Sequence, residues 1–259
     1  MSMLALYLVN IVLVARLFLL FRDDAVNLRY VTMTTALQLV ALSLLTPSLS
    51  VGLLGLGFVT VNAAWLWAEQ RFSTRFYMVR LVVLAALLVL LGFFLSPVIG
   101  LSFRTSLPDN LRHLSQYFAF ADIVKDTEWK IVHTYVAGVL LCCNEANMAI
   151  RMIIDGLNLR PSATGSSNSS NNLANVEYKR GRVIGLLERL TLFFLVLDGQ
   201  FGALGFVIAA KTMARFKNLD DRDFAEYFLV GTLLSLVAAG SVALFTRWLL
   251  AGAAVSSFV

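Results

Sequence analysis

The chain has few charged residues, two cysteines and two histidines, and each shortage excludes a class of protein. Charged side chains make up 14% of the 259 residues, against about a quarter in a soluble domain. Because 59% of the chain is hydrophobic and its mean hydropathy is +0.78, a soluble globular fold is excluded. Cys142 and Cys143 are adjacent within an apolar run, which excludes an intrachain disulfide framework and a cysteine-based metal site.

The sequence also lacks the motifs of common enzymes. It contains no HExxH, no G-x-S-x-G, no P-loop and no paired-aspartate motif of the lipid phosphotransferases. The histidines are His113 and His133, and His133 falls on a helix face that does not match that of Glu145, so no metal site is expected. We therefore predict a protein that is not an enzyme, with no catalytic residues, no metal and no cofactor.

What the chain does contain is a series of long apolar runs. Runs of about 17–25 residues cross a hydrocarbon core at about 1.5 Å per residue. We expect membrane spans at residues 4–21, 30–45, 49–68, 76–95, 131–154 and 224–250. The first run lacks a basic flank and a cleavage site, so we expect a retained span and not a signal peptide. The predicted fold class is an all-α, polytopic transmembrane helical bundle.

Changes in composition divide the chain into modules. Residues 1–160 are predicted to form an N-terminal five-span module, in which residues 97–130 mix charged, aromatic and small polar side chains as an interfacial amphipathic segment does. Residues 161–176 contain GSSNSSNN and are predicted to be a flexible polar linker. Residues 177–259 are predicted to form a C-terminal membrane module.

The C-terminal module contains an apolar stretch, residues 183–210, that is broken by Asp198, Gly199 and Gln200 and has basic residues at both ends. Basic residues favour the cytoplasmic ends of spans, which also accounts for the net charge of +5. Each arm has about 14–16 residues, or about 21–24 Å, too short to span comfortably. The sequence therefore predicts a re-entrant or broken helix near the C-terminus; the alternative is one long tilted span.

The fifth span carries a set of polar residues at helical spacing. At about 100° per residue, His133, Asn144, Asn147 and Arg151 fall on one narrow stripe, whereas Glu145, a further intramembrane charge, points about 120° away. Such a stripe indicates the lining of a pore or cavity. Hydrogen bonds between packed helices are the alternative explanation.

Ionisable residues also occur inside the broken stretch. Glu188 and Arg189 are predicted to be intramembrane charges, with Glu188 paired to Arg151 on another helix. Asp198 and Gln200 stand at the break, where irregular backbone is tolerated if protein buries it or water reaches it. We expect them to line a pore, gate or substrate site, and a structural corner is the alternative.

Six basic residues flank the stretch: Lys179, Arg180, Arg182, Lys211, Arg215 and Lys217. If both flanks are cytoplasmic, these side chains gather at one mouth of the hairpin. Such a cluster is typical of an anion vestibule or of a docking site for a phosphorylated ligand. Anchoring to lipid headgroups is the alternative.

Three segments carry a resemblance to a known family: GRVIGLLERL at residues 181–190, GFVIAAKTMARF at residues 205–216 and EYFLVGTLLS at residues 226–235. They resemble a bacterial integral membrane protein family of unknown function, whose members are sometimes paired with SatD-like proteins. The resemblance implies that the following charged positions are typical of the family: Glu188, Arg189, Lys211, Arg215 and Glu226.

These observations lead to one functional hypothesis and two alternatives. The polar stripe, the polar break and the basic mouth together predict an oligomeric, anion-preferring ion channel, gated by a cytoplasmic ligand or partner. A defence effector that depolarises the membrane would have this layout. The alternatives are a transporter or lipid-handling carrier, and a non-conducting scaffold for a soluble partner protein. The expected partners are membrane lipids, other copies of the chain and a cytoplasmic ligand or soluble protein.

Overall fold

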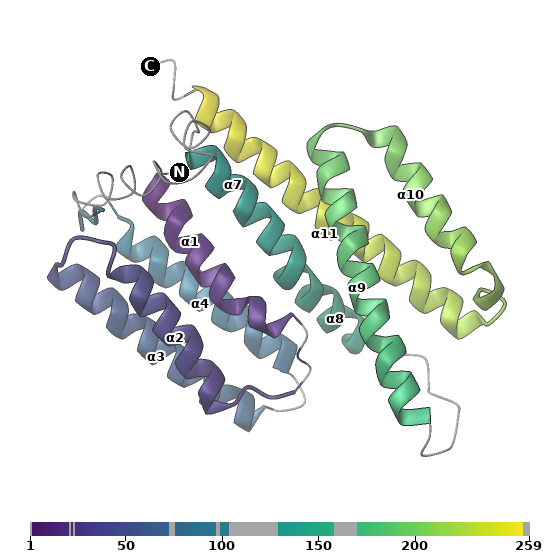
Figure 1. Cartoon of the computed structure of the whole chain (residues 1–259), viewed down its shortest axis with the longest axis horizontal. Helices are drawn as coiled ribbons and strands as arrows, with labels where there is room; N and C mark the ends of the chain where they lie inside the picture. Colours follow the sequence, from purple (N-terminus) through teal and green to yellow (C-terminus); the bar gives the residue numbers. More distant parts are fainter. Residues whose placement is uncertain are drawn as a thin grey trace, which may run out of the picture. The chain divides into compact units, whose positions relative to one another are not determined.

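The computed structural model describes residues 2–20, 22, 24–72, 76–96, 99–103, 129–157 and 170–255, and every regular element among them is a helix (Figure 1). Most of the predicted amphipathic segment at residues 97–130 and most of the predicted linker lie outside the described residues. Two compact units are present. Unit 1 contains Met1–Phe18, Asp24–Ala137 and Gly252–Val259, and unit 2 contains Leu19–Asp23 and Gly138–Ala251.

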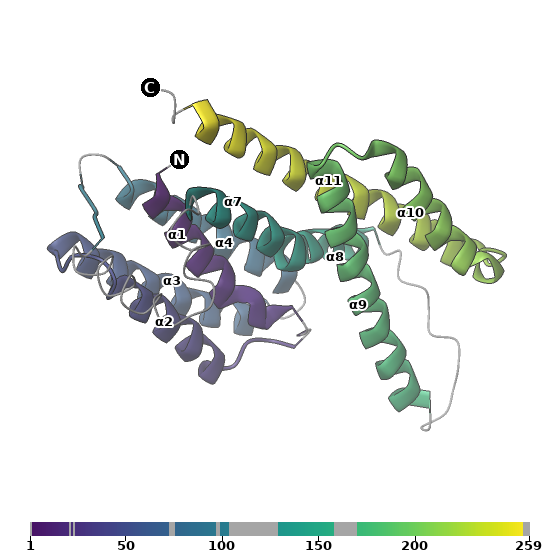
Figure 2. The ribbon, with the colours of Figure 1, turned by 45° about the horizontal axis from the view of Figure 1, so that its top comes forward.

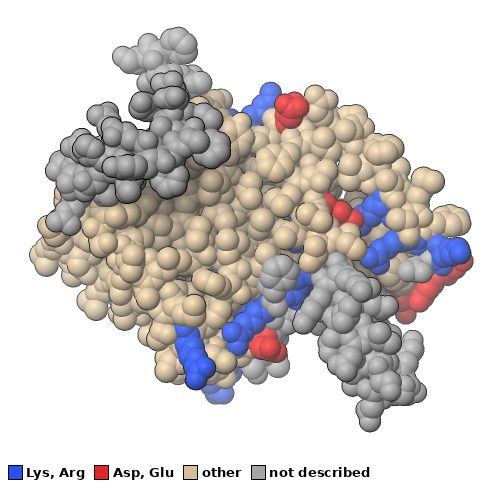
Figure 3. All heavy atoms as spheres, in the orientation of Figure 1, with Lys and Arg blue, Asp and Glu red and all other residues tan. Residues whose placement is uncertain are grey.

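Among the described residues, four helices are long and apolar enough to cross a membrane. They are α3 (Leu49–Arg71), α4 (Phe76–Phe94), the continuous helix Trp129–Gly156, and the segment Arg222–Ala251. The all-α prediction is confirmed for the described residues, and the four helices are compatible with a multi-pass membrane protein. One space-filling face consists mainly of uncharged side chains (Figure 3).

The first two predicted spans are helical but short. The apolar helical segment Met3–Leu19 has 17 residues, and α2 (Leu28–Leu42) has 15. At about 1.5 Å per residue they measure about 25 and 22 Å, less than a hydrocarbon core of about 30 Å. The first narrows into a 3₁₀ turn at its end, and the second ends before the turn that contains Pro47.

Unit 1 is built on α1 (Met3–Arg16), α2, α3 and α4, which contact one another in the pairs α1–α2, α2–α3, α3–α4 and α1–α4 (Figure 1). Ser48 starts α3, because its hydroxyl accepts a hydrogen bond from the backbone N–H of Val51 at 3.3 Å. Buried leucines on facing sides fill the core, among them Leu6, Leu54 and Leu87.

A charged cluster is fully enclosed in unit 1. Glu69 on α3 and Arg80 on α4 have side chains that are 0% exposed, and Arg80 Nε donates to Glu69 Oε1 at 2.7 Å. The same carboxylate accepts hydrogen bonds from Trp65 Nε1 at 2.8 Å and from the backbone N–H of Val26 at 2.7 Å. Arg16 on α1 donates to the carbonyl of Arg80 at 2.9 Å. The cluster therefore ties three helices and an incoming loop together.

Unit 2 takes its helices from the second half of the chain. The helix α7 (Trp129–Leu140) begins in unit 1 and continues through a π-helical turn, η3 (Leu141–Glu145), into α8 (Ala146–Gly156). They are followed by α9 (Ser170–Leu197), α10 (Phe201–Ala214), the short η4 (Phe216–Asn218) and α11 (Arg222–Val255). The core contains Cys142 from η3, Leu192, Phe193 and Val196 from α9, and Ala239 and Ala243 from α11.

The division between the units differs from the predicted module boundary at residue 160. The chain divides between Ala137 and Gly138, inside the fifth predicted span. The reason is packing: the second half of that span supplies Cys142 to the core shared with α9 and α11. Helix α9 begins at Ser170, within the segment predicted as a linker.

Gly138 permits close packing in unit 2, and Gly138→Ala is expected to destabilise the protein. A Cβ at Gly138 would lie 2.6 Å from Thr246 Oγ1 and 2.7 Å from Phe193 Cζ, inside van der Waals contact. Overpacking of this kind costs about 1–3 kcal/mol. Gly240→Ala on α11 is the matched control, because its Cβ meets nothing within 4 Å. Thermal unfolding in detergent should show a lower midpoint for Gly138→Ala alone, and equal midpoints would contradict the packing described.

Candidate functional site

A helical hairpin in unit 2 carries the candidate site. Helix α9 ends at Leu197 and α10 starts at Phe201, and the two helices run antiparallel and side by side (Figures 1 and 2). Gly199 has φ +77°, a left-handed conformation that glycine adopts without steric cost. The N–H of Gln200 closes the turn on the carbonyl of Leu195 at 2.8 Å. The predicted helix break is therefore confirmed.

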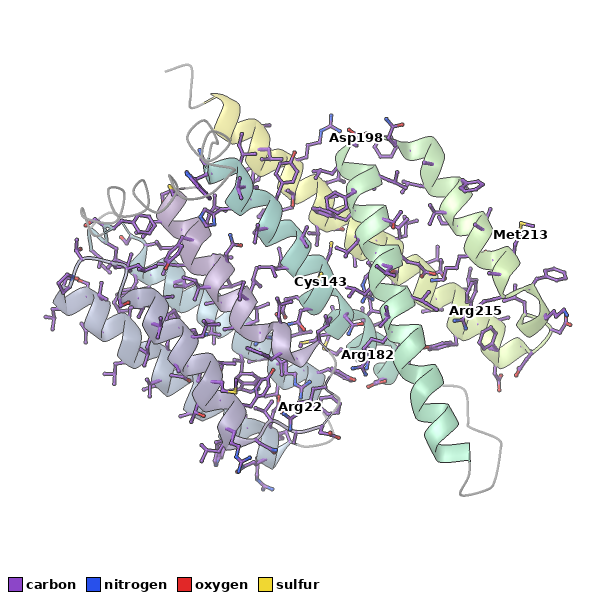
Figure 4. The ribbon with its side chains drawn as sticks, in the orientation of Figure 1. Arg22, Cys143, Arg182, Asp198, Met213 and Arg215 are labelled. Carbon is purple, nitrogen blue, oxygen red and sulfur yellow. The ribbon has the colours of Figure 1, made fainter. Side chains whose placement is uncertain are left out.

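The two ends of the hairpin differ in character. Asp198 lies at the tip, at the opposite end from Arg182 on α9 and Arg215 at the end of α10 (Figure 4). Asp198 and Gln200 are exposed at the tip. Neither residue lines the cavity between α9, α10 and α11 that is described below.

An ion pair joins the two arms of the hairpin. Lys211 Nζ on α10 donates to Glu188 Oε2 on α9 at 2.5 Å, and the two side chains are 22% and 19% exposed. The ammonium also lies 5.4 Å from the ring centroid of Phe228 on α11. Glu188 stands ten residues before Asp198 and six after Arg182, or about 15 Å and 9 Å along the helix. The pair therefore lies within the apolar part of the arms and is half-buried there.

A small cavity adjoins this ion pair. Its volume is about 10 Å³, and it is lined by Glu188, Leu192, Val207, Ile208, Lys211, Thr232 and Ser235. Ser235 is 7% exposed, and its Oγ has no hydrogen-bond partner among the described residues. The hydroxyl of Thr232 donates to the carbonyl of Phe228 at 2.7 Å. The cavity thus combines an ammonium, a carboxylate and an unpartnered hydroxyl on three different helices.

A second polar group links α9 to the π-helical turn. Arg189 is 5% exposed, and its Nη2 donates to Asn147 Oδ1 at 3.0 Å. Asn144 Nδ2 donates to Glu145 Oε1 at 2.9 Å, and both side chains are buried. The Arg189–Asn147 hydrogen bond connects α9 with α8, and so holds the arm of the hairpin that carries Glu188.

The four residues of the predicted stripe do not share one face. A π turn takes one more residue than an α turn and so rotates the following residues by about 100°. His133 lies in unit 1, where Asn10 Nδ2 donates to its Nδ1 at 3.0 Å. Asn144, Asn147 and Arg151 belong to unit 2, where Arg151 lies close enough to Arg189 to interact with it electrostatically.

The sequence predicts Arg151 as the partner of Glu188, and the structure shows Glu188 in an ion pair with Lys211 on α10. The hairpin register explains this pairing. Glu188 lies eleven residues before Gly199, and Lys211 lies twelve residues after it. Because the chain folds back at Gly199, the two residues come to lie opposite each other on the antiparallel arms. That symmetry was present in the sequence and could have identified the pair.

The six basic residues of the predicted mouth have different environments. Arg182 is buried and its Nη1 donates to the carbonyl of Leu20, which belongs to the same unit, at 3.3 Å. Lys211 lies in the ion pair, Arg215 is half-buried and Lys217 is exposed. Lys179 and Arg180 lie in α9, and their side chains fall outside the described residues.

Comparison of the chain with protein-family models, with curated proteins and with solved structures finds no match. The fold by itself defines the class: in the part of the chain that the structure describes, it is all-α, with four helices long and apolar enough to cross a membrane. Within that class, the distinguishing feature is the charged hairpin α9–α10 with the cavity against α11.

Proposed function

We propose that this protein conducts small ions across a membrane through a pore formed by several copies of the chain. The observation that carries the proposal is the Glu188–Lys211 ion pair within the apolar hairpin, beside the unpartnered hydroxyl of Ser235. A charged side chain at the centre of a bilayer costs about 2.5–3.5 kcal/mol on insertion scales, and such side chains mark ion pathways.

The lengths of the hairpin arms support a re-entrant arrangement. Helix α10 has 14 residues, about 21 Å, and the apolar part of α9 at residues 183–197 measures about 22 Å. Both fall short of a core of about 30 Å. A hairpin that enters and returns keeps Arg182, Arg215 and Lys217 on one side, which the positive-inside tendency assigns to the cytoplasm. These basic side chains favour an anion-preferring pathway.

The exposed surface of α10 supports assembly of several copies. None of its 14 residues, all of which are described, is buried. Its large apolar side chains include Phe201, Phe206 and Met213, and Met213 points away from α9 (Figure 4). A helix with so little cover from its own chain needs lipid or a neighbouring copy around it. If several copies of the chain assemble around a symmetry axis, their α9–α10 hairpins would place their polar side chains along one ion path.

The location that we propose is the bacterial inner membrane. It rests on the resemblance of residues 181–190, 205–216 and 226–235 to a bacterial membrane family, together with the four membrane-length helices. Gating by a cytoplasmic ligand or partner is part of the same proposal, because the hairpin ends are basic.

Recordings in planar bilayers with a KCl gradient test this function. The wild-type protein is expected to conduct, with a reversal potential displaced towards that of chloride. Lys211→Met removes the intramembrane ammonium and is expected to lower conductance at least about tenfold, since an anion would lose its charged partner. Arg71→Met, which removes an exposed cation from the last turn of α3 in unit 1, is the control and should leave conductance unchanged. A silent wild type, with or without bacterial cytosol, would contradict the proposal, as would equal losses in both variants.

A carrier is the second candidate, and the cavity of about 10 Å³ beside a broken helix favours it. Transporters bind substrates at broken helices of this kind. Saturable flux into liposomes without unitary current steps would identify a carrier, whereas unitary steps would identify a channel.

A further inference from the structure

We infer that Lys211 and Ser235 form a binding site for a small monovalent anion, and that the carboxylate of Glu188 occupies this site in the structure. Glu188 is then the gate: an anion enters only when the carboxylate has left or been neutralised. The inference rests on the proposed ion conduction, for which it names the class of ion and the residue that blocks it.

The donors at the site suit an anion. A lysine ammonium has three N–H donors, and in this site Glu188 accepts one of them at 2.5 Å. Phe228 holds the ammonium in place through a contact of 5.4 Å between Nζ and the ring centroid. The hydroxyl of Ser235, which lines the same cavity, is nine-tenths buried and unpartnered, so it can donate a second hydrogen bond.

Because the cavity is small, the carboxylate of Glu188 and an external anion cannot occupy the site at the same time. About 10 Å³ is the lower limit for one water molecule. A halide does not fit beside the carboxylate in this state. If the side chain of Glu188 moves out, its two oxygens vacate the space next to Lys211, and one halide can take their place. The site therefore holds either its own carboxylate or an external anion.

The charges around the site indicate that neutralising Glu188 favours the binding of an anion. Glu188 and Lys211 together are neutral, and neutralising Glu188 leaves one ammonium in apolar surroundings, where an uncompensated charge is strongly unfavourable. Besides the pair, the described side chains of η3, α8, α9, α10 with its C-cap, and α11 comprise six basic and four acidic groups: Arg151, Arg182, Arg189, Arg215, Arg222 and Arg247, and Glu145, Asp155, Asp223 and Glu226. A site with this surplus of positive charge recruits an anion.

The first test measures binding without transport. Purified Glu188→Gln in detergent is expected to show a thermal unfolding midpoint that rises by several degrees, saturably, when bromide replaces gluconate at constant ionic strength. Wild type, Glu188→Asp and the double variant Glu188→Gln/Lys211→Met should show no saturable rise. Glu226→Gln, which breaks an exposed ion pair with Arg222, is the matched control. No bromide effect on Glu188→Gln would overturn the anion site.

The second test measures flux, and its Ser235→Ala variant keeps the proposal testable if Glu188→Gln does not fold. In liposomes, Glu188→Gln is expected to raise chloride flux about tenfold, and Ser235→Ala to lower it several-fold without changing potassium flux. Bromide binding to Glu188→Gln with no flux in any variant would support the site and contradict the conduction. Wild-type conduction with unchanged chloride selectivity in both variants would overturn the site and leave the conduction standing.

Discussion

Lys211→Glu is expected to abolish accumulation of folded, membrane-inserted protein. The substitution sets two carboxylates against each other where Lys211 Nζ and Glu188 Oε2 are now 2.5 Å apart. Two like charges about 4 Å apart repel by about 4 kcal/mol at an effective dielectric constant of 20, a large share of the stability of a folded protein. The swap Glu188→Lys/Lys211→Glu restores opposite charges and should recover most of the monodisperse protein seen in gel filtration after detergent extraction.

The exposed ion pair of α11 provides the control for this charge reversal. Arg222 and Glu226 are 89% and 51% exposed, so Arg222→Glu should leave the yield unchanged, since solvent screens such pairs. If the double swap yields as little protein as Lys211→Glu, the pairing between α9 and α10 is contradicted. Normal yield from Lys211→Glu alone would contradict it as well.

Glu69→Ala is expected to have the largest effect on unit 1. It removes the carboxylate that Arg80 and Trp65 contact at 2.7 and 2.8 Å, at a position with no exposure to solvent. Breaking a buried pair by removing one partner costs about 3–5 kcal/mol. Thermal unfolding in detergent should therefore show a strongly lowered midpoint, or no folded protein.

Two further variants separate the loss of charge pairing from general damage to unit 1. Arg71→Ala, at an exposed position on the last turn of α3, should leave the midpoint unchanged. Glu69→Leu/Arg80→Met removes both charges and should be more stable than Glu69→Ala, because apolar replacement of a buried pair is often close to neutral. An unchanged midpoint for Glu69→Ala would show that the cluster does not hold unit 1 together.

The sequence predicts the features that depend on local chemistry. Long apolar runs predict the membrane-length helices, and Gly199 between two polar residues predicts the break between α9 and α10. The ion pair follows from that break, because Glu188 and Lys211 are nearly equidistant from Gly199.

The remaining features depend on contacts that no local pattern encodes. The π turn at Leu141–Glu145 shifts the helical register, and without it the polar residues after Cys143 would share a face with His133. Glu69 and Arg80 meet Val26 and Arg16 from distant parts of the chain. Their burial results from how α1, α3 and α4 pack, which periodicity along a single helix does not specify.

The central claim is that the α9–α10 hairpin enters the membrane and returns to the same side. The most direct test is the reactivity of single cysteines towards a membrane-impermeant maleimide, in a Cys142→Ala/Cys143→Ala background. Gly181→Cys and Lys217→Cys sit at the two hairpin ends, both at exposed positions. In sealed vesicles of known orientation, we predict that both react from the same, cytoplasmic side. Reaction of the two positions from opposite sides would contradict the hairpin and the ion path built on it.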